Sequence, residues 1–412
     1  MQNSAVLFNN DAVLFGVIAV ILGVVFYTSH SSHRYCQAFY RFVPALLLCY
    51  FLPSLLNTFG LIDAEGSSIY HVASRYLLPA SLVLFTISVD FKAILGLGPK
   101  ALIMFFTGTL GIMIGGPIAL LIVGSLAPDA LGGDIWRGMT TIAGSWIGGG
   151  ANQTAMREVF KVDNTIFSVM ITVDVIMANI WMAVLLIWAS RAESFDKKTG
   201  ADTSAIRELK QRIEHYQAQH ARIPQLHDLM LIIAVGFGAT AIAHFAADGI
   251  APWIAKEAPQ LAMYSLTSTF FWLVVVATTL GLLLSNTKLR KLEAVGASKM
   301  ASVFLYILVA SIGMQMDIRA ILDYPIMFVV GVVWMAIHAG LLVIVAKWIK
   351  APLFYLAVGS QANVGGAASA PIVAAAFHPS LAPVGVLLAV LGYGVGTYGA
   401  YLCGLMLQFA AP

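Results

Sequence analysis

Three consecutive glycines and two amide side chains interrupt a long apolar segment at Gly144-Ser-Trp-Ile-Gly-Gly-Gly-Ala-Asn-Gln-Thr154. Glycine weakens a helix, and irregular backbone is tolerated at membrane depth only where protein or a cavity surrounds it. A similar stretch, Gly359-Ser-Gln-Ala-Asn-Val-Gly-Gly-Ala-Ala-Ser369, returns in the C-terminal half, and Pro371 follows it. The two stretches predict broken segments at 136–160 and 351–377.

The composition around these stretches is that of a membrane protein. Hydrophobic residues make up 59% of the 412 residues and charged residues 10%, against roughly 25% charged in soluble domains. This balance excludes a nucleic-acid binder, an ordinary cytosolic enzyme and a disordered chain. The three cysteines, Cys36, Cys49 and Cys403, form neither a metal-ligand spacing nor a disulfide framework. We expect an all-α polytopic membrane protein.

Ten further stretches are long and apolar enough to cross a bilayer, for which a helix needs about 20 residues. The first lacks the basic flank of a signal peptide, because 1–12 carries no Lys or Arg. The predicted spans are Ala12–Thr28, Phe42–Ile62, Tyr76–Val89, Ala101–Ala127, Asn164–Ala189, Asp228–Phe245, Tyr264–Ser285, Ala301–Met316, Pro325–Ile349 and Pro383–Leu407.

The chain also contains an internal repeat. The pattern Ile87-Ser-Val-Asp-Phe-Lys-Ala-Ile-Leu95 returns as Met314-Gln-Met-Asp-Ile-Arg-Ala-Ile-Leu322, and each copy precedes one long span and one broken stretch. The repeat divides the chain into residues 1–190 and 228–412. The polar linker 191–227 joins them, and an amphipathic helix is predicted over Thr203–Gln219.

The distribution of basic residues decides how the two halves are oriented. If each broken stretch enters and leaves by one face, each half has five crossings and the halves are inverted. Most Lys and Arg residues, seven of them in 191–227, then lie in the cytoplasm, as the positive-inside rule requires. We expect ten spans, two re-entrant hairpins, both termini outside a bacterial inner membrane and a cytoplasmic linker. A protein of ten or twelve spans without hairpins remains the alternative.

Polar side chains and glycines at the two breaks are the candidate solute-binding groups. Amide side chains are costly to bury and add nothing to close helix packing, although small residues alone can serve packing. The candidates in the first break are Ser145, Gly148, Gly149, Gly150, Asn152, Gln153 and Thr154, and those in the second are Ser360, Gln361, Asn363, Gly365, Gly366 and Ser369.

A carboxylate inside a predicted span is the candidate coupling group. Asp174 lies near the middle of Asn164–Ala189, with Thr172 and Asn179 nearby, and an ionisable residue at this depth is a functional candidate. It could bind sodium, together with Asn152 and Asn363, or carry a proton; the alternative is a carboxylate satisfied within the bundle. No enzymatic constellation and no cofactor other than sodium is predicted. His244 and His338 are interpreted as satisfied core residues, with a role in proton relay as the alternative.

The two glycine-rich runs and the repeated Asp-Phe-Lys-Ala-Ile-Leu pattern resemble the YjcL-like membrane proteins, a family labelled domain of unknown function eight-one-nine. More distantly, the layout is similar to the sodium–glutamate symporters and the 2-hydroxycarboxylate transporters. That resemblance implies inverted five-span repeats with glycine hairpins, a homodimer and an elevator-like moving part. Glycine tips would correspond to Gly148–Gly150 and Gly365–Gly366, and neither tip carries an arginine that could hold a carboxylate.

These observations predict a secondary active transporter of a small polar solute, amino-acid-like or an organic acid, coupled to sodium or protons. A sodium/proton antiporter is the nearest alternative. A channel would need a continuous polar lining that the spans do not show. A membrane sensor on a transporter fold would need a soluble domain larger than 191–227. The expected partners are the solute, the bilayer and a second copy of the chain, and not nucleic acid.

Overall fold

A computed structural model describes residues 9–40, 43, 45–62, 66–127, 131–201, 224–264, 266–315, 324–378 and 381–411. These residues are helical and contain no strand. In chain order the helices are α1 (Asp11–Ser29), α2 (Arg34–Tyr40), α3 (Ala45–Thr58), α4 (Ile69–Val72), the π-helix η1 (Ala73–Leu77), α5 (Leu78–Ile87), α6 (Phe91–Leu95), α7 (Pro99–Leu126), α8 (Ile135–Val159), α9 (Asn164–Ala189), α10 (Ala192–Thr199), α12 (Leu226–Glu257), the 3₁₀ helix η3 (Pro259–Tyr264), α13 (Thr269–Leu284), the 3₁₀ helix η4 (Lys288–Val295), α14 (Ala297–Gly313), α15 (Ile326–Trp348), α16 (Leu353–Val364), α17 (Gly366–Phe377) and α18 (Ala382–Ala410).

Six of the described helices are long and apolar enough to cross a membrane: α1, α7, α9, α12, α15 and α18. The other predicted spans coincide with shorter helices. These are α3, α13 and α14, with 14, 16 and 17 residues, and the continuous run of α4, η1 and α5 over 69–87. An all-α protein with several apolar spans is therefore established, while the count of ten crossings stays a prediction.

Local sequence explains where several helices begin. α9 starts at Asn164 because the side chain of Asp163 accepts a hydrogen bond from the Thr165 amide, which satisfies one of the free amides of the first turn. Asn10 caps α1 and Ser268 caps α13 in the same way. The predicted bounds of Asn164–Ala189 are those of α9.

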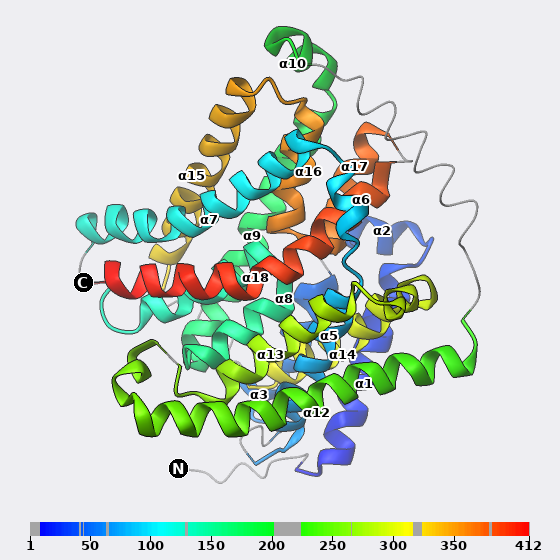
Figure 1. The fold of residues 1–412 in the computed structure, drawn as a ribbon, viewed down its shortest axis with the longest axis vertical. Helices are drawn as coiled ribbons and strands as arrows, with labels where there is room; N and C mark the ends of the chain where they lie inside the picture. The colour runs from blue at the N-terminus through cyan, green and yellow to red at the C-terminus, as the bar shows by residue number, and fades with distance from the viewer. Residues whose placement is uncertain are drawn as a thin grey trace.

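The helices pack in two groups (Figure 1). One contains α7, α8 and α9 with α15, α16, α17 and α18, in which α8 and α7 pack extensively on α18 and α15, respectively. The other contains α1, α3 and α5 with α12, α13 and α14. Fewer contacts join the groups, chiefly those of α18 with α5 and α13 and of α13 with α8. Each group thus takes helices from both halves of the chain.

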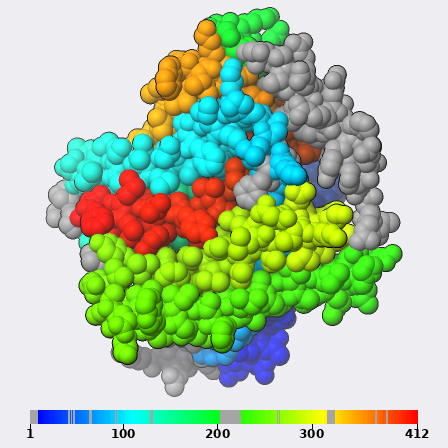
Figure 2. Space-filling view, in the orientation of Figure 1, coloured from blue at the N-terminus to red at the C-terminus, as the bar shows by residue number. Residues whose placement is uncertain are grey.

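The outer faces of the bundle are apolar, as a bilayer requires. Figure 2 shows α12 running along one face of the molecule with its outer side uncovered. That side carries exposed large residues, including Leu231, Ile242, Phe245 and Trp253. An uncovered face that carries several large apolar side chains is typical of a surface that meets lipid or another membrane helix.

Two predictions fall outside the described residues. The amphipathic helix at Thr203–Gln219 lies in 202–223, and most of the second repeat copy, including Asp317, lies in 316–323. In the first copy, Asp90 forms an ion pair with Arg290 at 2.9 Å, which joins the end of α5 to η4.

Candidate functional site

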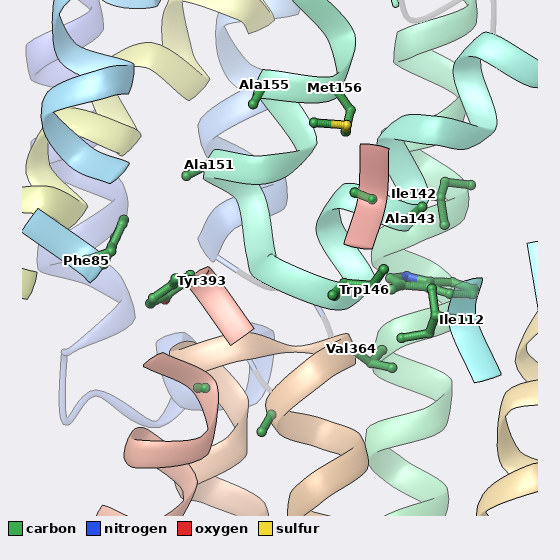
Figure 3. Close-up of a cluster of buried hydrophobic side chains, with 14 of the residues drawn as sticks. Phe85, Ile112, Ile142, Ala143, Trp146, Ala151, Ala155, Met156, Val364 and Tyr393 are labelled. Carbon is green, nitrogen blue, oxygen red and sulfur yellow. The ribbon is translucent and has the colours of Figure 1, made fainter. Parts of the chain in front are cut away.

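The first break reverses the direction of α8 at Gly149. This residue has φ 74° and ψ −176°, a conformation essentially restricted to glycine. A Cβ atom built on Gly144 would lie 2.6 Å from the backbone oxygen of Asn152. Residues eight apart in a continuous helix are about 12 Å apart along the axis, so the two arms lie against each other. Figure 3 shows the turn, with Ala143 on one arm and Ala151 on the other.

The second break separates α16 from α17. α16 ends at Val364, and α17 begins at Gly366 with φ 56°. The side-chain amide of Gln361 donates to the hydroxyl of Ser369, eight residues later, at 2.7 Å. A Cβ on Gly365 would lie 1.8 Å from that hydroxyl oxygen. The predicted helix breaks therefore lie at Gly149 and at Gly365–Gly366, and in both the chain folds back on itself.

Both breaks contact one residue of α18, Tyr393. A Cβ built on Gly149 would lie 3.1 Å from Cε1 of Tyr393, and one built on Gly366 would lie 3.9 Å from its hydroxyl oxygen. Figure 3 shows Tyr393 beside the turn of α8, with Phe85 of α5 on its other side. The rings of Phe85 and Tyr393 have centroids 4.3 Å apart. The two breaks, 216 residues apart in sequence, thus converge on one point of the bundle.

Gly392 brings the ends of both incoming arms together. A Cβ on Gly392 would lie 2.9 Å from the carbonyl oxygen of Ile147 and 3.4 Å from that of Ala362. The last carbonyls of a helix carry partial negative charge and the first amides partial positive charge. Each break therefore presents carbonyls that suit a cation and amides that suit an anionic group. Gly149, Gly150, Gly365 and Ser369 are half-buried, whereas the arms before them are almost entirely buried.

Asp174 of α9 accepts hydrogen bonds from both arms of α8. It is 5% exposed. Its Oδ1 accepts from the indole Nε1 of Trp146 at 2.7 Å, and its Oδ2 accepts from Nε2 of Gln153 at 2.9 Å. Ser145 lies beside the same carboxylate. Trp146 lies before the break and Gln153 after it, so one neutral donor from each arm holds the carboxylate.

Asn152 fastens the first break to α18. Its Nδ2 donates to the carbonyl of Gly148 at 2.9 Å and to that of Tyr393 at 3.2 Å. Its Oδ1 accepts from the hydroxyl of Thr397 at 2.6 Å. Thr397 in turn hydrogen-bonds to Thr278 of α13 at 3.1 Å, which links the break to the second helix group.

Asn363 makes the equivalent contacts from the second break to α7. Its Nδ2 donates to the carbonyls of Gly359 and Phe105 at 2.9 and 3.0 Å, and its Oδ1 accepts from Thr109 at 2.8 Å. Asn152, Asn363 and Asp174 share no hydrogen-bond partner among the residues that the structure describes. The structure therefore does not bring these three predicted sodium ligands to a single point, although each amide oxygen keeps a free lone pair.

Ser360 belongs to a separate buried network. Its hydroxyl oxygen accepts from Nε1 of Trp181 at 2.8 Å and lies 2.7 Å from Nε2 of His338, whose Nδ1 is 3.0 Å from the carbonyl of Gly108. Because a carbonyl can only accept, Nδ1 carries a proton and Nε2 of the neutral ring accepts from Ser360. His338 is a satisfied core residue, as predicted.

The remaining candidates bond locally. Thr154 donates to the carbonyl of Gly150, Thr172 to that of Ser168 and Asn179 to that of Val175. Neither Thr172 nor Asn179 hydrogen-bonds to Asp174 among the described residues. Likewise, no cluster of three His, Cys, Asp or Glu side chains that could hold a metal ion occurs in the described ranges.

Three buried side-chain atoms have no hydrogen-bond partner in the part of the chain that the structure describes: Oε1 of Gln361, and Nε and Nη1 of Arg157. Oε1 of Gln361 is an acceptor at the second break, where a cation or a donor group of a solute would satisfy it. Arg157 lies within the predicted broken segment 136–160, and its burial, at 5% exposed, is what distinguishes it from the other charges near that segment.

The linker reaches the base of the second break. Asp196 of α10 accepts a hydrogen bond from the backbone amide of Leu353 at 2.8 Å, in the first turn of α16. Burial raises the pKa of Asp196, and this hydrogen bond opposes the rise. The contact stabilises the start of α16 as a helix cap does.

The family described as "Protein of unknown function (DUF819)" matches residues 16–410 of the chain. The chain belongs to this family. The DUF819 chain is 24% identical over 352 residues to "Uncharacterized membrane protein YjcL" of Bacillus subtilis (strain 168), an alignment that covers 82% of this chain and 83% of the relative. The resemblance predicted from the two glycine-rich stretches is thereby confirmed, and this DUF819 chain is a membrane protein with several apolar helices.

Proposed function

We propose that this protein is a secondary active transporter of a small polar solute, coupled to sodium or protons. The observation that carries the proposal is the convergence of two helix breaks on Tyr393 and Gly392. Discontinuous helices that meet in the bundle core supply the unpaired backbone groups from which transporter sites are built. The orphaned Oε1 of Gln361 adds a side-chain acceptor to one of the breaks.

In this proposal the two broken segments are re-entrant hairpins that enter from opposite faces of an inner membrane. The incoming and return arms of α8 form one hairpin, and α16 and α17 form the other. Ten crossings in two inverted halves then place both termini outside and 191–227 in the cytoplasm. The solute binds where the hairpin tips meet, and Asp174 couples its movement to the cation.

The two-group packing supports an elevator-like movement. The group of α7–α9 and α15–α18 contains both breaks, and fewer contacts join it to the group of α1, α3, α5 and α12–α14. Movement of the first group against the second would expose the site to each face in turn. The resemblance to elevator transporters implies that the second group also forms the interface of a homodimer.

Solute counterflow in proteoliposomes tests the proposal. Purified protein is reconstituted with a panel of amino acids and organic acids, with and without an inward sodium or proton gradient. We expect at least one solute to exchange, and its accumulation to depend on one of the gradients. The absence of uptake for every member of the panel under both gradients contradicts the proposal.

The position of Asp174 favours one second candidate, a sodium/proton antiporter. Its carboxylate is buried in α9 among neutral donors, as a cation- or proton-carrying group would be. An antiporter exchanges cations with no organic solute present, and Asp174→Asn would abolish this exchange. Cation exchange in vesicles that contain only inorganic salts therefore separates the two functions.

A further inference from the structure

Arg157 is a buried cation that the solute site proposed above does not use. It lies on the return arm of α8, eight residues after Gly149, and is 5% exposed. Residues eight apart on a helix are about 12 Å apart along the axis. Arg157 therefore lies near the base of the first break and not at its tip. The tip itself, Gly148–Gly150, carries no arginine.

The groups around the guanidinium are mostly neutral. Nη2 donates to Oε1 of Gln315 at 3.1 Å and to Oδ1 of Asn164. The rings of Tyr70 and Phe167 lie 4.6 and 5.1 Å from its carbon Cζ. Two aromatic rings thus lie within cation–π range of the guanidinium, and two amide oxygens accept hydrogen bonds from one of its nitrogens.

The nearest acid does not neutralise Arg157 fully. Oε1 of Glu158 lies 3.8 Å from Nη1, beyond hydrogen-bond range. The same carboxylate accepts from the hydroxyl of Tyr70 and forms a 3.2 Å ion pair with Arg75. Two guanidinium groups therefore share one carboxylate, and this cluster of described residues has an excess positive charge.

Three of the five N–H groups of Arg157 have no acceptor among the described residues, namely the one on Nε and the two on Nη1. A buried charge that is only partly compensated costs stability. A carboxylate is the anion that matches the planar geometry of a guanidinium. A neutral carbonyl would accept a hydrogen bond but would leave the charge uncompensated.

We propose that Arg157 binds the carboxylate group of the solute at the base of the first break, about 12 Å from the site at the hairpin tips, on the path by which the solute reaches or leaves that site. The inference rests on the proposed transport function and names its substrate class as organic acids. Gln153 lies one turn earlier on the same face of the return arm, where it bonds to Asp174 and lies 3.5 Å from the hydroxyl of Tyr50. A carboxylate at Arg157 would therefore extend the polar groups that begin at Asp174 toward the base of the break.

Ligand-dependent thermal stability of the full-length protein in nanodiscs tests this inference without any gradient. The probes are succinate, propionate and L-glutamate, with succinamide and propionamide as neutral isosteres and chloride as the inorganic anion. We expect a saturable rise in Tm of at least about 2 °C with one or more carboxylates. We expect no rise with the amides, and none with chloride at equal ionic strength.

Three variants connect the response to the residue. Arg157→Gln should abolish the carboxylate response, and Arg157→Lys should weaken it. Arg137→Gln is the matched control. Arg137 lies in the first turn of α8, and because the chain folds back at Gly149 it also lies at the base of the break, where it donates to the carbonyl of Phe160. It is more exposed than Arg157 and is paired with Asp134 at 2.7 Å. Arg137→Gln should leave the response unchanged. If Arg157→Gln fails to fold, a weakened carboxylate response in Arg157→Lys supports the inference, and an unchanged response in that variant overturns it.

Four outcomes overturn the inference. One is an equal rise in Tm with chloride, which would mark an inorganic anion site. Another is a carboxylate response that survives in Arg157→Gln. The third is no response to any carboxylate. Gradient-driven uptake of a neutral solute would also overturn it, but would leave the transport proposal intact. A rise in Tm with a carboxylate, without uptake of any solute, would support the inference and contradict the transport proposal.

Discussion

Replacement of Gly149 by alanine tests the geometry of the first break most sharply. Its φ of 74° and ψ of −176° belong to a region that other residues reach only at a cost of about 1–3 kcal/mol. The new Cβ would also lie 3.1 Å from Cε1 of Tyr393, and crowding in a packed core adds about 1 kcal/mol. We expect Gly149→Ala to lower the free energy of unfolding by about 2–4 kcal/mol.

Gly150→Ala is the matched control. Gly150 has no positive φ, and its nearest neighbour, Cδ2 of Leu305, would lie 3.8 Å from the new Cβ. Alanine is favoured over glycine within a helix by about 0.5–1 kcal/mol, so this variant should be as stable as the parent or slightly more stable.

Unfolding by SDS titration in mixed micelles, followed by tryptophan fluorescence, measures the difference between the two variants. We expect Gly149→Ala to unfold at a clearly lower SDS fraction than Gly150→Ala. Equal midpoints for the two variants would refute the reasoning, because they would mean that the chain does not turn in a left-handed conformation at Gly149.

Three further predictions concern the groups that hold the breaks. Asp174→Asn leaves one of the donors, Trp146 or Gln153, facing an NH₂ group, and should lower the free energy of unfolding in micelles by about 1–3 kcal/mol. The variant should also remove the gradient dependence of uptake; uptake that still depends on the gradient would exclude Asp174 from the cation path. Asn152→Ala and Asn363→Ala should each lower the free energy of unfolding by about 1–3 kcal/mol, because buried carbonyl and hydroxyl partners lose their hydrogen bonds. The losses should add in the double variant, since the two amides share no partner among the described residues, and strong non-additivity would indicate that the breaks are coupled. Asp196→Ala should lower the free energy of unfolding by about 0.5–2 kcal/mol and speed hydrogen exchange at the start of α16. Glu193→Ala, which removes an exposed ion pair with Lys197, should change neither, and equal exchange rates in the two variants would rule out the cap.

Helix positions could be predicted from the sequence where a long apolar run has clear ends. The bounds Asn164–Ala189, predicted from hydropathy alone, are those of α9, and the structure adds that Asp163 caps its first turn. The interruption at 148–150 could be predicted because three glycines cannot hold a lipid-facing helix. The bounds of α3 and α14 could not. α3 is shorter than the apolar run Phe42–Ile62, and α14 begins at Ala297, four residues before the predicted span, because the chain turns at Gly296 with φ 103°.

The partners of the polar side chains were not predictable, because they lie far away in sequence. Tyr393 is 244 residues from Gly149, and Asn363 reaches Phe105 and Thr109 of the other half. No periodicity within one sequence encodes such contacts. Arg157 shows the same limit: its charge suggests a loop residue, and only the rings and amides brought around it by other helices make it a buried cation.

Cysteine labelling at the two breaks tests the central claim most directly. Single cysteines at Gly150 and Ser369, in a background without Cys36, Cys49 and Cys403, are treated with a membrane-impermeant maleimide and with a lipophilic one. We predict that both positions react with the water-soluble reagent and that a transported solute slows the reaction. A cysteine at the exposed outer position Ile242 of α12 should react only with the lipophilic reagent. If Gly150→Cys and Ser369→Cys behave like Ile242→Cys, the breaks face acyl chains and do not form a solute site.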